Sequence, residues 1–114
     1  MKPGDVVLAR LQQSDGKLKT RPALVLANMP PYGDHLLAGV SSQLRHEVKG
    51  LDEIISPTDQ DYPASGLKVA SLIRMGMIAT LPSNAILGRV GSISSLRLTR
   101  LMGNFIAAIE SDVR

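Results

Sequence analysis

Residues 5–27, DVVLARLQQSDGKLKTRPALVLA, decide the predicted fold of this chain. Two runs within this stretch, residues 5–11 and 22–27, are rich in Val and Leu and too short for free-standing helices, which is typical of strands. The polar, basic stretch between them contains Asp15 and Gly16, a pair that strongly favours a tight turn. The stretch therefore predicts a β-hairpin with a basic tip.

More short strands are expected after this hairpin, separated by Pro and Gly residues. The ranges with strand composition are 35–43, 51–55, 68–73, 75–81 and 87–93. After them apolar residues recur every three to four positions, and Ser94 or Ser95 can cap a helix, so the chain is expected to end in an amphipathic helix. The expected core face of this helix carries Leu98, Leu101, Phe105 and Ile109.

This pattern predicts a mainly β fold with a terminal α-helix, built as a small, strongly curved antiparallel barrel or half-barrel. The 114 residues lie in the size range of one domain, so residues 1–114 are expected to form a single domain. A sheet this small has exposed edges, and pairing with a second copy would cover them.

Composition excludes several kinds of chemistry. The chain has no Cys and two His, so it offers no thiolate nucleophile and could build a zinc site only with help from carboxylates. We expect neither a metal nor another cofactor. Lys and Arg number 13 against 10 Asp and Glu, and the net charge of +3 favours an anionic partner. Aromatic residues make up 3%, which disfavours a binder that stacks bases on aromatic rings. No apolar run approaches the roughly 20 residues needed to cross a bilayer, and no signal segment is evident, so we expect a cytoplasmic protein with no membrane contact.

Polar side chains are expected to meet on one concave surface of the sheet. Ser41 and Gln43 fall on the same face of the third predicted strand, because alternate residues of a strand face opposite sides. Pairing of this strand with the hairpin would bring Arg21 to that face. Lys17 and Lys19 lie just before Arg21 in the basic tip.

These groups suit a phosphodiester. An arginine presents a planar fork to two non-bridging oxygens, a serine contributes a hydroxyl, and a glutamine both donates and accepts. RNA can be cleaved without a metal because its 2′-hydroxyl can act as the nucleophile. The protein then has to align that hydroxyl and stabilise the charge that develops on the phosphorus centre.

Several motifs occur in a specific order along nearly the whole chain. They are residues 2–7 (KPGDVV), 20–26 (TRPALVL) and 40–43 (VSSQ), with weaker support from 71–74 (SLIR), 79–82 (ATLP) and 87–91 (LGRVG). In these motifs the sequence resembles the MazF/PemK toxins of bacterial type II toxin-antitoxin systems.

The resemblance implies an SH3-like barrel, a homodimer and a cognate antitoxin that blocks the site. It also implies an endoribonuclease that cleaves single-stranded mRNA at specific sequences, by attack of the 2′-hydroxyl and without a metal or the ribosome. The family's arginine maps to Arg21, as the phosphate and transition-state anchor, and its threonine or serine maps to Ser41, as a positioning hydroxyl. The expected RNA-binding residues are Lys17, Lys19, Thr20, Gln43 and Arg74.

The chain departs from this family at two acid/base positions. Some members carry an arginine, one residue and an aspartate where this chain has Arg74 and Gly76, and some carry a histidine in the first loop, which here has none. The general acid and base therefore stay unassigned. Two alternatives remain open: a weakened or inactive barrel that binds an antitoxin or RNA, and a toxin that poisons a protein target such as a topoisomerase.

Overall fold

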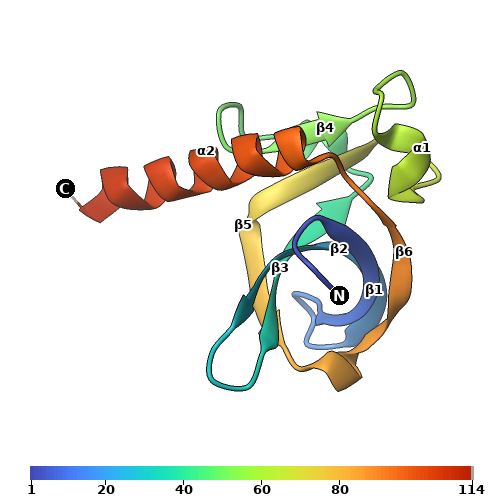
Figure 1. Ribbon diagram of the computed structural model, residues 1–114, viewed down its shortest axis with the longest axis vertical. Coiled ribbons are helices and arrows are strands. Elements are labelled where there is room, and N and C mark those ends of the chain that lie inside the picture. The colour runs from blue at the N-terminus through green and yellow to red at the C-terminus, as the bar shows by residue number, and fades with distance from the viewer. Residues whose placement is uncertain (114) are drawn as a thin grey trace.

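A computed structural model describes residues 1–113, and within them six strands form one antiparallel sheet (Figure 1). The strands are β1 (Asp5–Gln12), β2 (Leu18–Met29), β3 (Asp34–Ser41), β4 (Glu53–Ile55), β5 (Ser71–Leu81) and β6 (Ile86–Ser92). Their order across the sheet is β4-β5-β3-β2-β1-β6, so the edge strands β4 and β6 do not pair and the sheet is not closed. The helices are α1 (Tyr62–Ser65) and α2 (Ser95–Val113), with short 3-10 turns η1 (Leu44–His46) and η2 (Ser83–Ala85). The prediction of a mainly β fold with a terminal helix is confirmed.

The predicted N-terminal hairpin is present. Strands β1 and β2 pair antiparallel, and the turn between them is closed by the Gln13 N–H, which donates to the Lys17 carbonyl oxygen at 2.8 Å. Gly16 has a φ of +83°, in the left-handed region that glycine adopts without strain. Strand β2 begins at Leu18 rather than at the predicted residue 22, because the polar residues of both arms also pair their backbones across the ladder.

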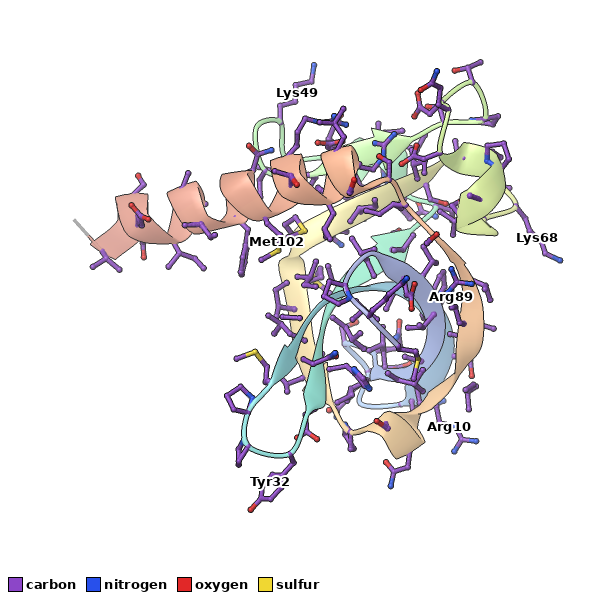
Figure 2. All side chains as sticks on the ribbon, in the orientation of Figure 1. Arg10, Tyr32, Lys49, Lys68, Arg89 and Met102 are labelled. Atoms are coloured by element: carbon purple, nitrogen blue, oxygen red, sulfur yellow. The ribbon has the colours of Figure 1, made fainter. Side chains whose placement is uncertain are left out.

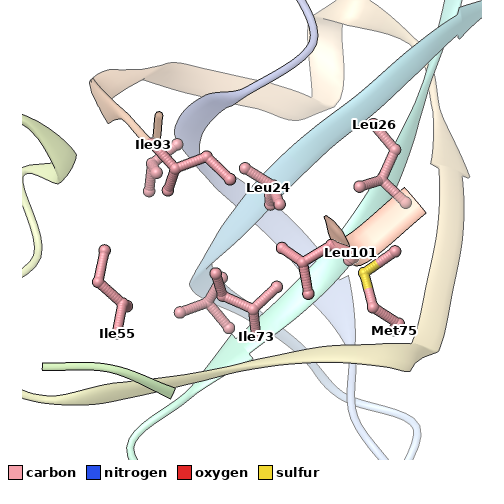
Figure 3. Packing of buried hydrophobic residues seen from close by; sticks show 10 residues of the cluster. Leu24, Leu26, Ile55, Ile73, Met75, Ile93 and Leu101 are labelled. Carbon is pink, nitrogen blue, oxygen red and sulfur yellow. The ribbon is translucent and has the colours of Figure 1, made fainter. Parts of the chain in front are cut away.

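Alternation along β3 divides the interior into two hydrophobic clusters within residues 1–113. Ala38 and Val40 face one cluster and Leu37 faces the other, as the period of two predicts. The larger cluster includes Leu101 of α2, and Figure 3 shows its side chains packed together. Its buried members are Val6, Leu24, Leu26, Ala38, Val40, Ile55, Ile73, Met75, Ile93 and Leu101. The smaller cluster has the buried members Val7, Ala9, Ala23, Val25, Leu37 and Ile86.

Strand β5 is one long strand where the sequence predicts two. Its pairing with β3 jumps from Gly39 opposite Arg74 to Ala38 opposite Ile78. Residues 75–77 are therefore extra residues in β5, and such a bulge bends a strand without ending it. Figure 1 shows this sharp bend, which leads β5 from its partner β4 down along β3.

Two helical features differ from the predictions. The four-residue helix α1 lies in a stretch where Pro57 and Pro63 predicted only irregular chain. The N-terminal half of α2 packs on the sheet through Leu101, which is fully buried, but its C-terminal half projects past β5 (Figure 1). The assignment of Ile109 to the core face is wrong, because its side chain lies beyond the sheet and is 49% exposed.

A charged cluster around Arg97 holds α2, β4 and the segment before α1 together. The buried guanidinium of Arg97 donates to Glu53 Oε1 at 2.9 Å, to Asp59 Oδ2 at 3.1 Å and to Asp61 Oδ2 at 2.8 Å. Arg100 adds two hydrogen bonds to Glu53. The hydrogen bonds from Arg97 lower the pKa of the Asp61 carboxyl to about 2, although burial of that carboxyl opposes the shift. No helix within residues 1–113 is long and apolar enough to cross a membrane.

Candidate functional site

A pocket of about 520 Å³ opens at the end of the sheet where β3 stops. Its walls come from β1, β2, the last residues of β3, the loop of residues 66–69, β5 and one residue of β6. A volume of this size accommodates a small-molecule-sized ligand.

The register of the sheet brings three of the predicted site residues to this pocket. Gly39 pairs with Ala23 on one side and with Arg74 on the other. Arg21 lies two residues before Ala23 and Ser41 two residues after Gly39, so both share the face on which Arg74 lies. Arg21, Ser41 and Arg74 all line the pocket. The polar face foreseen from the sequence is thus assembled, with Gly39 on the strand between the two arginines and Met77 packed closely over it.

Hydrogen bonds orient the two predicted residues at the end of β3. The Gln43 N–H donates to Ser41 Oγ at 3.0 Å, so the Ser41 hydroxyl keeps its own proton to donate. The Gln43 Oε1 atom accepts from Arg45 Nη1, which leaves the amide nitrogen of Gln43 for a ligand. Gln43 also lines the pocket.

The pocket is electropositive. Among the residues of the described chain that line it, three are cationic, namely Arg21, Lys68 and Arg74, and none is Asp, Glu or His. Nor do three or more His, Asp or Glu gather anywhere in residues 1–113 in a way that could hold a metal ion. The arrangement can bind an anion, orient it through the guanidinium groups of the two arginines, and donate a hydrogen bond to it from the Ser41 hydroxyl.

Three of the predicted RNA-binding residues lie outside the pocket. Lys17, Lys19 and Thr20 are exposed on the extension of the β1–β2 hairpin. Lys19 pairs with Leu11, which lines the pocket, so Lys19 stands beside the rim. Thr20 pairs with Arg10 on the opposite face of the hairpin. These residues can reach only the part of a long ligand that leaves the pocket.

Other side chains that could exchange protons with RNA or stack on a base have structural partners or lie elsewhere. His35 is buried, with its ring nitrogens 2.6 Å from Asn28 Oδ1 and 3.0 Å from Ser83 Oγ. Glu53 belongs to the Arg97 cluster. Tyr32 is exposed at the tip of the β2–β3 hairpin, and Figure 2 shows it at the bottom of the view, away from Lys68 at the right.

Gly76 marks the departure from the family motif, and it does not line the pocket. It lies in the β5 bulge, and a Cβ built there meets nothing within 4 Å. Its backbone has no positive φ. The position is therefore open to a side chain, and the glycine is not required by packing.

The sequence missed several pocket residues. Lys68 and Val69 lie in a loop, so the strand predicted over 68–73 is wrong at its start, and Met77 lies in a bulge that interrupts the alternation of β5. A strand over 35–43 would turn Ser42 to the core side, but β3 ends at Ser41, so Ser42 is exposed and lines the pocket. Its polarity and its place next to Ser41 were the signals that could have pointed to it.

Comparisons with known proteins point to one family and one fold. Residues 2–108 match the family described as PemK-like, MazF-like toxin of type II toxin-antitoxin system. The structure is similar to an endoribonuclease in complex with its cognate antitoxin from a mycobacterial species, with a TM-score of 0.71 and 13% identity over 96% of this chain and 95% of that chain. It is also similar to the Mycobacterium tuberculosis toxin MazF-mt6, with a TM-score of 0.70 and 16% identity over 93% of this chain and 96% of that chain. No curated protein matches the sequence.

Proposed function

The chain belongs to the PemK-like, MazF-like toxins of type II toxin-antitoxin systems, and on that premise we propose that it is a metal-independent endoribonuclease. Its substrate is single-stranded mRNA in the cytoplasm, cleaved at specific sequences. All of residues 1–114 serve as one toxin domain.

One observation carries this proposal: the pocket combines two arginines with a hydroxyl that keeps its proton. Arg21 and Arg74 lie on one face, separated by Gly39, and can grip the non-bridging oxygens of a phosphodiester. Such a site favours the negative charge that builds up on phosphorus in the transition state.

The reaction then uses the nucleophile that RNA itself supplies. The 2′-hydroxyl loses its proton as its oxygen attacks the adjacent phosphorus. The bond to the 5′-oxygen breaks and that oxygen takes up a proton, so that a 2′,3′-cyclic phosphate and a 5′-hydroxyl end result. Arg21 anchors the phosphate, and Ser41 positions the phosphate through a hydrogen bond that its hydroxyl donates. Lys17, Lys19, Thr20 and Gln43 hold the flanking RNA.

Two protein partners belong to this proposal. A cognate antitoxin binds over the pocket, because an acidic segment complements the cations that line it. A second copy of the chain packs against α2, whose projecting half exposes an apolar stripe with helical spacing, formed by Ile106, Ile109 and Val113.

A non-catalytic binding module is the second candidate function. The observation in its favour is that, of the described residues that line the pocket, none is a carboxylate or an imidazole that could move a proton. Such a protein would hold RNA or an antitoxin in the same pocket without cleaving it.

The deciding experiment incubates the purified protein with long single-stranded RNA in EDTA. The wild type is expected to cleave, and Arg21→Ala is expected to cleave about 100-fold to 1000-fold more slowly, the usual cost of losing one donor to a developing charge. Lys49→Ala is the matched control, because Lys49 is an exposed cation that does not line the pocket.

The three outcomes separate the candidates. Cleavage by wild type and Lys49→Ala, with much slower cleavage by Arg21→Ala, supports the nuclease. Equal cleavage by Arg21→Ala contradicts the assignment of the anchor. Tight RNA binding by the wild type without cleavage across many sequences favours the binding module.

A further inference from the structure

Three exposed apolar side chains share the mouth of the pocket with its cations. Val69 is 57% exposed, Met77 is 53% exposed and Val90 is 38% exposed, and all three line the pocket. They come from three different segments, the loop of residues 66–69, the β5 bulge and β6. We call these three side chains the apolar wall. Contact of these apolar side chains with water is unfavourable in free energy, and a bound apolar group would remove that contact.

Each part of the apolar wall is held in place by its neighbours. The buried Ser71 hydroxyl donates to the Val69 carbonyl oxygen at 2.8 Å, which fixes the end of the loop. A Cβ added to Gly39 would lie 3.3 Å from the Met77 Cβ, so the bulge packs closely over β3. The wall is thus formed before any ligand arrives, which lowers the cost of binding.

A similar close approach fixes the third residue. A Cβ on Gly66 would lie 2.1 Å from the Val90 carbonyl oxygen, and one on Gly91 would lie 2.3 Å from the Ala64 carbonyl oxygen. The backbone of residues 64–66 therefore rests directly on β6. Loop and strand form one surface, without a layer of side chains between them.

The occupant of this wall must combine a flat apolar part with a negative charge. Arg21, Lys68 and Arg74 supply the countercharge in the same pocket. We propose that the apolar wall seats the nucleobase next to the scissile phosphate, so that aliphatic side chains hold the base in a chain with 3% aromatic residues. This inference rests on the proposed function and adds to it the base subsite of the substrate.

Two amides in the pocket favour a base over an acidic peptide side chain. The Gln13 Nε2 atom donates to the Leu11 carbonyl oxygen at 3.1 Å, which leaves the Gln13 Oε1 atom as an acceptor. The amide nitrogen of Gln43 remains as a donor. A base edge presents donors and acceptors together, and glutamine amides can pair with both.

The test compares RNA cleavage by the wild type with cleavage by the double variant Val69→Ala, Met77→Ala. We expect kcat/KM to fall about tenfold, as for the loss of one base contact. We also expect a broader base preference at one position flanking the cleavage site. The salt dependence of kcat/KM should stay as in the wild type, because the substitutions remove no phosphate contact.

Two further variants make the result specific. Val48→Ala with Leu87→Ala removes equally exposed aliphatic side chains outside the pocket and should cleave like the wild type. Val69→Ile with Met77→Leu keeps the apolar wall and should retain the wild-type cleavage pattern. Thermal unfolding of all variants checks that the fold is intact.

The outcomes distinguish this inference from the function on which it rests. A wild type that cuts no RNA overturns both. A wild type that cuts, with a Val69→Ala, Met77→Ala variant of unchanged rate and base preference, overturns the base subsite alone. Unchanged cleavage combined with weaker binding of an acidic antitoxin segment would assign the wall to a protein partner and would likewise overturn it.

Discussion

At the scale of single residues, Arg97 and its three carboxylates are the most consequential group outside the pocket. Its side chain is 8% exposed and that of Asp61 is 10% exposed, so the pair is shielded from water and little screened by salt. The cluster ties the start of α2 to the segment that leads into α1 and on to the pocket loop. It therefore supports the site from a distance, without contact with a ligand.

The lowered pKa of Asp61 predicts how stability depends on pH. A carboxyl whose pKa is about 2 in the folded protein, against an ordinary 3.8, contributes stability above pH 3.8, which is lost as the pH falls through 2. Asp61→Asn should therefore lower the free energy of unfolding by about 2 kcal/mol at pH 7. The difference from wild type should vanish as the pH falls from about 4 to 2. Urea unfolding at pH 7 and at pH 2 measures both values.

Asp112→Asn is the control, because Asp112 is exposed near the end of α2. It should leave the free energy of unfolding unchanged at both pH values. A variant Asp61→Asn as stable as wild type at pH 7 would contradict the contribution assigned to this ion pair.

At the scale of elements, two glycines have opposite roles. Gly91 in β6 lies so close to the α1 backbone that there is no room for a side chain. Gly103 in α2 is exposed, and a Cβ there meets nothing within 4 Å. The sequence marks both as breaks in a pattern and does not distinguish them. Only the second is a weak point of its element, because glycine in a helix interior costs conformational entropy without a packing gain.

Alanine at these positions should therefore have effects of opposite sign. Gly91→Ala should lower the free energy of unfolding by about 1 to 3 kcal/mol, the usual cost of overpacking. It should also disturb the pocket loop. Gly103→Ala should raise it by up to about 1 kcal/mol. Chemical denaturation of the two variants at one pH provides the measurement, and a Gly91→Ala variant with wild-type stability would contradict the close backbone contact.

At the scale of the whole molecule, α2 is longer than the sheet that it covers. Its first half is part of the core, and its second half extends past β5 with the apolar stripe uncovered (Figure 1). An exposed stripe of this kind is typical of an interaction surface. The pocket lies elsewhere, among β1, β2, β5 and the loop of residues 66–69, so association through α2 leaves its lining residues unchanged.

The proposed dimer predicts that a charge on this stripe separates the subunits. Ile109→Glu should shift the protein from dimer to monomer in analytical ultracentrifugation at micromolar concentration, because burying an unpaired carboxylate is costly. Ser111→Glu, on the opposite side of the helix, should stay dimeric. A wild type that is monomeric under the same conditions would refute the proposal for this surface.

Local patterns in the sequence were sufficient to predict the elements that nearby residues specify. The N-terminal hairpin follows from two short apolar runs around a turn, and α2 follows from apolar spacing behind a serine. The face shared by Arg21 and Ser41 follows from strand alternation once the two strands are paired with each other. Each of these depends on a period of two or 3.6 residues, which the chain carries wherever it folds.

The sequence by itself thus determined the type of fold, the hairpin, the terminal helix and the polar face that became one side of the pocket. The tertiary structure alone decided that Lys68, Val69 and Met77 complete the pocket, that residues 75–77 form a bulge and that half of α2 remains uncovered. The reason is physical: these features depend on the register between strands and on the length of a helix relative to the sheet beneath it. Both are set by contacts between residues far apart in the chain, and no local period records them.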